Sequence, residues 1–142
     1  MSGERPFTDV IVRLRQAGLR PTRQRMALAK ILFEGGDRHV TAEMLRAEAL
    51  QAKVSVSLAT VYNTLHQFTD AGLLREIVVD SQRSYFDTNT GDHHHFYFEE
   101  SRRLEDIPGE GVSVRGLPSP PKDAEVTRID VIVRVKESTH IE

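Results

Sequence analysis

The chain of 142 residues contains no cysteine. Disulfides, cysteine-rich zinc sites, iron–sulfur clusters and cysteine nucleophiles are therefore excluded together, and any metal must bind through nitrogen and oxygen. Long apolar runs are also missing, since no stretch approaches the roughly 20 apolar residues that span a bilayer. The N-terminus, MSGERPFTDV, lacks the apolar core of a signal peptide. We therefore expect a cytoplasmic protein without a membrane segment.

Charge is small overall but unevenly distributed along the chain. The formal net charge of −2 argues against indiscriminate binding to nucleic acid, yet residues 1–75 carry a net charge of +4 and residues 76–142 one of −6. Seven basic residues lie within the first thirty positions, a cluster typical of a surface that binds a polyanion. The acidic half fits either cation binding or a solvated surface.

Apolar residues in the first half recur with the period of an α-helix. In residues 7–18, for example, Phe7, Val10 and Leu14 fall on one face, and Gly18 follows as a stop signal. The same reasoning, with Thr41 and either Ser55 or Ser57 as N-caps, predicts four helices in total. They cover approximately residues 7–18, 21–35, 41–52 and 57–71.

The pattern changes to that of strands after the fourth helix. Residues 74–78 alternate loosely, Asp80-Ser81-Gln82 predicts a turn, and residues 83–87 return as a second strand. Helices followed by a two-stranded ribbon are typical of a winged helix-turn-helix, in which the helix before the wing enters the major groove of double-stranded DNA. We assign residues 1–88 to a winged-helix DNA-binding domain and residues 57–71 to its recognition helix.

Residues 92–142 predict a smaller β-rich domain. Strands are expected over residues 95–98 and, most clearly, over residues 126–135. Proline and glycine are frequent between positions 108 and 121, which forbids a long helix there. The predicted fold class is therefore α+β.

Polar side chains on the fourth predicted helix lie outside the apolar stripe of Leu58, Val61, Leu65 and Phe68. They are Ser57, Thr60, Tyr62, Asn63, Thr64 and Gln67. Asparagine and glutamine can pair bidentately with adenine, and hydroxyl groups can contact the DNA backbone or a base. The alternative is a polar helix face that contacts only solvent.

Three consecutive histidines, His93 to His95, are the second candidate site. Adjacent residues of an extended segment point to opposite sides, so His93 and His95 share a face while His94 points away. Imidazoles together with carboxylates match the ligands of zinc, iron or manganese. The alternative is an exposed polar loop. The other candidate ligands around the histidines are Asp92, Asp87, Asp106 and His39.

Six short stretches carry a resemblance to a known family. They are residues 19–25, 37–43, 57–65, 71–74, 85–88 and 92–97, and Leu-Ala-Thr-Val-Tyr at 58–62 is the most specific of them. These stretches resemble the ferric uptake regulator (Fur) family, and specifically its iron response regulator (Irr) branch. The resemblance implies a winged-helix domain joined to an α/β dimerisation and effector-sensing domain over residues 92–142. It also implies a homodimer that binds AT-rich inverted repeats near iron-metabolism genes.

The resemblance also assigns roles to individual residues. It implies that Tyr62 contacts bases, that Arg20 enters the minor groove, and that Asn63 replaces a common arginine. The candidate DNA-binding residues are Arg20, Arg23, Arg25, Ser57, Thr60, Tyr62 and Asn63. The resemblance implies that the family's interdomain regulatory metal site maps onto five residues, with two aspartates where glutamates are usual. They are His39, Asp87, His93, His95 and Asp106. Its structural zinc, held by paired Cys-X-X-Cys motifs, cannot form in this chain.

The Irr branch further implies a response to haem through His93, His94 and His95, and a possible protein partner in haem synthesis. The sequence thus predicts an iron- or haem-responsive transcriptional regulator of iron uptake and haem metabolism genes, and not an enzyme. One alternative is a manganese- or zinc-responsive regulator of the same fold. Others are a small non-haem iron enzyme built on the His/Asp cluster, or a metal-storage protein without sequence-specific DNA affinity.

Overall fold

The computed structural model describes residues 8–108 and 110–137. The chain divides into two compact units, with the boundary between Thr90 and Gly91. Phe7, which was expected within the first helix, lies outside the described residues. None of the helices in the described ranges is long and apolar enough to cross a membrane.

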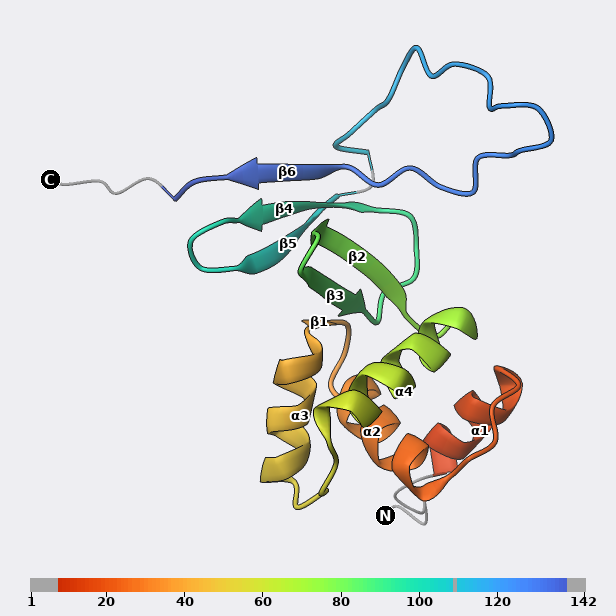
Figure 1. Ribbon diagram of the computed structural model, residues 1–142, viewed down its shortest axis with the longest axis vertical. Coiled ribbons are helices and arrows are strands. Elements are labelled where there is room, and N and C mark those ends of the chain that lie inside the picture. Colours follow the sequence, from red (N-terminus) through yellow and green to blue (C-terminus); the bar gives the residue numbers. More distant parts are fainter. Residues whose placement is uncertain (1–7, 109, 138–142) are drawn as a thin grey trace, which may run out of the picture. The chain divides into compact units, whose positions relative to one another are not determined.

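The first unit contains the four predicted helices. They are α1 (Thr8–Gln16), α2 (Arg23–Phe33), α3 (Ala42–Gln51) and α4 (Leu58–Asp70) (Figure 1). Three of them begin at a hydroxyl side chain that accepts a backbone N–H, at Thr22, Thr41 and Ser57. Gly72, which follows α4, has a φ of 83°, a conformation in which a side chain would be strained. The predicted helices are therefore confirmed, with caps at Thr41 and Ser57 as expected, whereas the cap of α2 at Thr22 was not predicted.

A small antiparallel sheet completes the first unit. Strands β2 (Arg75–Asp80) and β3 (Arg83–Asp87) form the predicted hairpin, and β1 (His39–Val40) pairs with the other edge of β3. The sequence did not predict β1, because two residues are too short to show an alternating pattern. Its pairing nevertheless sets His39 directly opposite Asp87.

The core of the first unit joins the helices to this sheet. Val61, Leu65 and Phe68 of α4 are fully buried, as the apolar stripe predicted, and they share one cluster with Phe86 of β3. Thr64 departs from expectation, since it was assigned to the polar face but is only 5% exposed. Its hydroxyl donates to the carbonyl of Thr60, one turn earlier, which satisfies the buried polar group.

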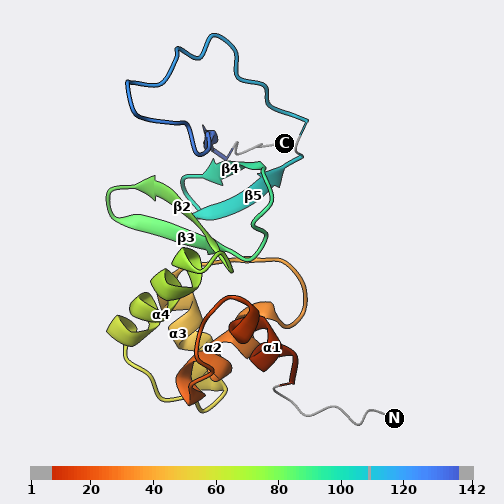
Figure 2. The same cartoon turned by 90° about the vertical axis from the view of Figure 1, so that its right-hand side faces the viewer.

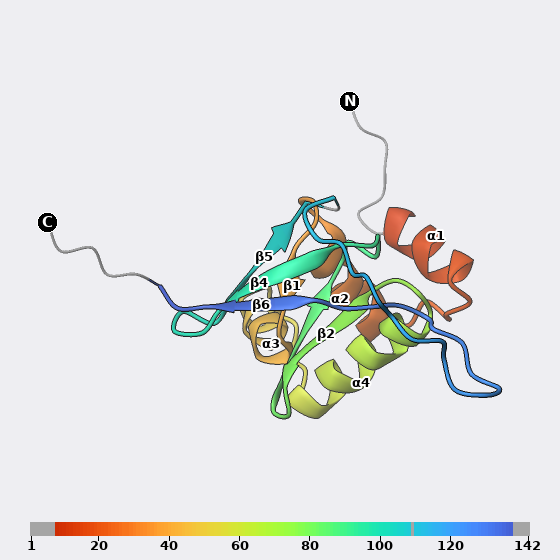
Figure 3. The same ribbon diagram turned by 90° about the horizontal axis from the view of Figure 1, so that it is seen from above.

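The second unit is a three-stranded sheet. Its strands are β4 (His94–Phe98), β5 (Arg103–Ile107) and β6 (Ile132–Val135), in the order β5-β4-β6. Figure 2 shows β4 and β5 side by side. Strand β5 runs antiparallel to β4, whereas β6 runs parallel to it (Figure 3). Over its described residues this unit contains no helix, in agreement with the proline and glycine between positions 108 and 121 and in contrast to the α/β domain that the resemblance implied.

The strand expected over residues 126–135 is shorter than predicted. Only Ile132–Val135 pairs, because the partner strand β4 is itself short and the register ends where Ile132 meets His95. Residues 126–131 are β-favouring, but a strand needs a neighbour for its backbone groups. The prediction for residues 126–131 was therefore wrong.

Candidate nucleic-acid interface and metal ligands

A polar hollow of about 440 Å³ lies beside α4 in the first unit. Asn63 and Gln67 are one helical turn apart, so they project from the same side of α4. The residues that line the hollow are Arg20, Thr22, Gln24, Arg25, Thr60, Asn63, Thr64 and Gln67. The structure thus brings four of the predicted DNA-binding residues to one hollow, namely Arg20, Arg25, Thr60 and Asn63.

Arg25 bridges α2 and α4 through its guanidinium group. Its Nε and Nη2 both donate to Oε1 of Gln67, at 3.2 and 3.0 Å, and its Nη1 donates to the backbone carbonyl of Arg20 at 3.0 Å. Arg20 and Arg23 are exposed. Ser57 is the N-cap of α4, and its hydroxyl both accepts the backbone N–H of Thr60 and donates to the Thr60 side chain.

Tyr62 is held by two neighbours that the sequence did not identify. Its ring stacks on His66, one turn later on α4, with centroids 6.3 Å apart. Burial raises the pKa of Tyr62 above its ordinary value, and the negative charge and hydrogen bond of Glu43 raise that pKa further. Glu43 lies in the first turn of α3, so its proximity to Tyr62 depends on how the helices pack.

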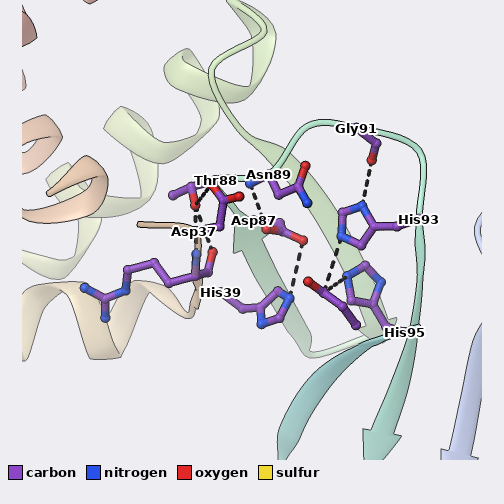
Figure 4. A network of polar contacts seen from close by, with 10 residues as sticks. Asp37, His39, Asp87, Thr88, Asn89, Gly91, His93 and His95 are labelled. Atoms are coloured by element: carbon purple, nitrogen blue, oxygen red, sulfur yellow. Dashed lines mark hydrogen bonds and ion pairs between the residues drawn. The ribbon is translucent and has the colours of Figure 1, made fainter. Parts of the chain in front are cut away.

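Two of the predicted metal ligands face each other within the first unit. The Nε2 of His39 lies 3.4 Å from Oδ2 of Asp87, and Figure 4 shows these side chains extending from neighbouring strands. Asp87 is only 1% exposed, and its Oδ1 accepts the backbone N–H of Asn89 at 2.9 Å. That hydrogen bond orients the carboxylate and leaves Oδ2 toward His39.

The other three predicted ligands meet within the second unit. The Nε2 atoms of His93 and His95 lie 3.4 and 3.3 Å from the same oxygen, Oδ1 of Asp106. This arrangement follows from the register, which pairs His95 with Asp106 across β4 and β5. Both imidazoles are buried, at 8% and 2% exposed.

Hydrogen bonds fix the orientation of two of the three consecutive histidines. The Nδ1 of His93 lies 2.7 Å from the carbonyl of Gly91 (Figure 4), so in the neutral ring it donates there and Nε2 keeps its lone pair. His94 instead accepts the backbone N–H of Val131 through Nδ1. The predicted alternation of the side chains is confirmed, because His94 contacts the backbone just before β6 while His93 and His95 both contact Asp106.

The donor atoms present fit a divalent cation. Two imidazole nitrogens converge on one carboxylate oxygen, and the His39–Asp87 pair repeats the same chemistry. Nitrogen and oxygen donors without thiolate suit iron, manganese or zinc. A structural zinc site of four cysteines does not fit, because the chain has none.

Comparison with known proteins identifies relatives over most of the chain. Residues 16–117 match the model of the ferric uptake regulator family. The chain is similar to the peroxide-responsive repressor PerR of Staphylococcus aureus strain Mu50, with 34% identity over 104 residues. That alignment covers 73% of this chain and 70% of the relative.

Solved structures show the same architecture. The ferric uptake regulator of Vibrio cholerae superposes with a TM-score of 0.70 at 22% identity, over 90% of this chain and 99% of that one. The ferric uptake regulator of Pseudomonas aeruginosa, solved with manganese, gives a TM-score of 0.66 at 24% identity, over 90% and 97% of the two chains. These likenesses confirm the α+β fold, with a helical first part and a β-rich second part.

Proposed function

The chain belongs to the ferric uptake regulator family, and from this premise we propose that it is a transcription factor whose binding to AT-rich inverted repeats depends on a metal held by its His and Asp side chains. Members of this family are regulators and not enzymes, and they bind DNA as dimers. We assign DNA binding to residues 1–88, and dimerisation with effector sensing to residues 92–142.

The DNA-binding assignment is supported by the face of α4 beside the hollow. Beside the hollow, Asn63 is exposed and Thr60 is half-buried, whereas Val61, Leu65 and Phe68 on the apolar side of the helix are fully buried. Tyr62 is also half-buried, but it is not among the residues that line the hollow. A buried stripe opposite a row of hydroxyl, amide and phenol groups is what a helix in the major groove needs. Arg20 and Arg23 add exposed positive charge for phosphate contacts, and Arg25 lies on the same hollow.

The single observation that carries the metal assignment is the convergence of His93 and His95 on Asp106. We propose that these residues, together with His39 and Asp87, supply the ligands of one cation, whose positive charge would offset the carboxylates. Asp87 and His93 are six positions apart, so the chain alone keeps them within roughly 20 Å of each other. Because the donors are imidazole and carboxylate without thiolate, the site suits ferrous iron, manganese or zinc, and the DNA-binding test below distinguishes them.

Haem is the alternative effector that the resemblance to the Irr branch suggests. His93 and His95 offer imidazole nitrogens that would hold a haem iron, whereas His94 accepts the backbone N–H of Val131. A role for all three histidines in one haem site would require His94 to leave this contact. A haem-synthesis partner is expected only if haem binds.

The test is fluorescence anisotropy with a labelled duplex that contains an AT-rich inverted repeat. Metal-stripped protein is compared with protein loaded with manganese, anaerobic ferrous iron, zinc or haem, at one salt concentration because phosphate contacts dominate apparent affinity. We expect protein loaded with manganese or ferrous iron to bind the inverted repeat more tightly than a scrambled duplex. In Tyr62→Ala this preference for the repeat should be lost. Binding that disappears only with haem would support the Irr-type response. Equal affinity for both duplexes in every state would refute the proposed function.

A further inference from the structure

The amide of Gln67 is restrained by Arg25. Two guanidinium nitrogens donate to its single oxygen, Oε1, from the same side chain. The Nη1 of Arg25 donates in turn to the backbone carbonyl of Arg20. The backbone N–H of Arg25 donates to the hydroxyl of Thr22, which caps the start of α2. The guanidinium is thus fixed at both ends, which holds the Gln67 amide in one orientation.

This orientation determines what Gln67 can offer to a ligand. With Oε1 engaged, the exposed side chain presents its NH₂ group, which can only donate hydrogen bonds. A glutamine that reads adenine must both accept from N6 and donate to N7. A glutamine restricted to donating is suited instead to bases with major-groove acceptors and no amino group at that edge, which are guanine (O6, N7) and thymine (O4).

We propose that Arg25 is a positioning residue that makes Gln67 a donor-only reader of guanine or thymine. The proposal rests on the assignment of α4 to the major groove, and Gln67 lies on the same hollow as Asn63. Arginine is needed because its planar fork places two donors on one oxygen, whereas lysine carries the same charge as a single point and cannot reproduce that geometry.

The experiment selects duplexes from a library randomised over about 25 base pairs, long enough for two half-sites one or two helical turns apart, using the full chain loaded with manganese. The wild type, Arg25→Lys, Gln67→Ala and the double variant are compared, with Arg115→Lys as a matched control in the exposed segment of the second unit. Melting curves establish that each variant is folded. Affinities for single-base variants of the selected site then give the discrimination at each position.

We expect the wild type to prefer guanine or thymine at one position of each half-site. Arg25→Lys frees the side-chain carbonyl of Gln67, so adenine becomes acceptable at that position of the half-site. We expect discrimination against adenine to fall roughly tenfold, and the salt dependence of binding to change little because the charge is kept. Gln67→Ala loses the same preference, and adding Arg25→Lys to it changes nothing more, since Arg25 acts through Gln67. Arg115→Lys keeps the wild-type preferences.

The outcomes that overturn the proposal can be told apart. If Arg25→Lys keeps every base preference of a selecting wild type, Arg25 does not position a reader. The proposal fails equally if Arg25→Lys and Gln67→Ala act additively on discrimination. If the wild type selects no common sequence, the DNA-binding function itself fails and the inference fails with it.

Discussion

Among single residues, the three consecutive histidines differ by what their rings contact. His93 and His95 converge on Asp106, while His94 accepts a hydrogen bond from the backbone of Val131. Neighbouring residues of identical type therefore make different contacts, because a strand alternates its side chains between two faces.

This alternation makes a testable difference between neighbours. His93→Ala and His95→Ala each remove one imidazole from the proposed metal ligands, so we expect manganese affinity to fall by at least about tenfold. His94→Ala is the matched control and should leave that affinity nearly unchanged. Isothermal titration calorimetry on metal-stripped protein measures all three. A loss in His94→Ala as large as in the other two variants would contradict the ligand assignment.

The sequence nominated the candidate ligands but not the contacts that orient them. The types and spacing of His39, Asp87 and His93 were enough to nominate them, since metal ligands come from few residue types. The carbonyl of Gly91 and the backbone N–H of Asn89, which orient these side chains, carry no signal in the sequence. Glu43 beside Tyr62 was missed for a similar reason, because its position depends on how α3 packs near α4.

Helix α4 depends on a defined N-terminal cap. Ser57 accepts the N–H of Thr60 with its side chain, which satisfies one of the unpaired donors of the first turn. We expect Ser57→Ala to lower the free energy of unfolding by about 1 kcal/mol. Urea denaturation followed by circular dichroism measures the change.

The control is Ser55→Ala, two positions earlier in the exposed loop, where the sequence had placed an alternative cap. It should change stability by less than about 0.5 kcal/mol, as an ordinary surface substitution does. Equal losses in the two serine variants would show that the cap at Ser57 contributes nothing particular.

Elements were predictable where a periodic pattern is long and bounded. The four helices and the β2–β3 hairpin each have a long periodic pattern and clear ends. Strand β1 is too short for a pattern, and β5 (Arg103–Ile107) mixes charged residues with only two buried apolar ones. At residues 126–131 the sequence predicted a strand that the structure does not form. β propensity describes a side chain's preference and not the presence of a pairing partner.

At the scale of the whole molecule, the proposed ligands are divided between the two compact units. His39 and Asp87 belong to the first, and His93, His95 and Asp106 to the second. A cation that takes ligands from both would stabilise both, by about 2.7 kcal/mol at a hundredfold excess over its dissociation constant.

Hydrogen exchange followed by mass spectrometry tests this division. Manganese should slow exchange in β1 and β3 of the first unit as well as in β4 and β5 of the second. In Asp87→Ala the effect should persist only in β4 and β5, because the triad of the second unit is intact. Slowed exchange confined to the second unit in the wild type would show that the first unit contributes no ligand.

The connection between β5 and β6 has a consequence for handling the protein. Strand β6 runs parallel to β4, so it starts at the end of the sheet where β5 finishes, and the gap is two strand spacings, roughly 10 Å. About four residues could cross it, yet the chain uses residues 108–131. Doubling a loop costs only about 0.6 kcal/mol. A fluorescent or affinity tag can therefore be inserted among the exposed residues 113–130 with the strand pairing kept intact.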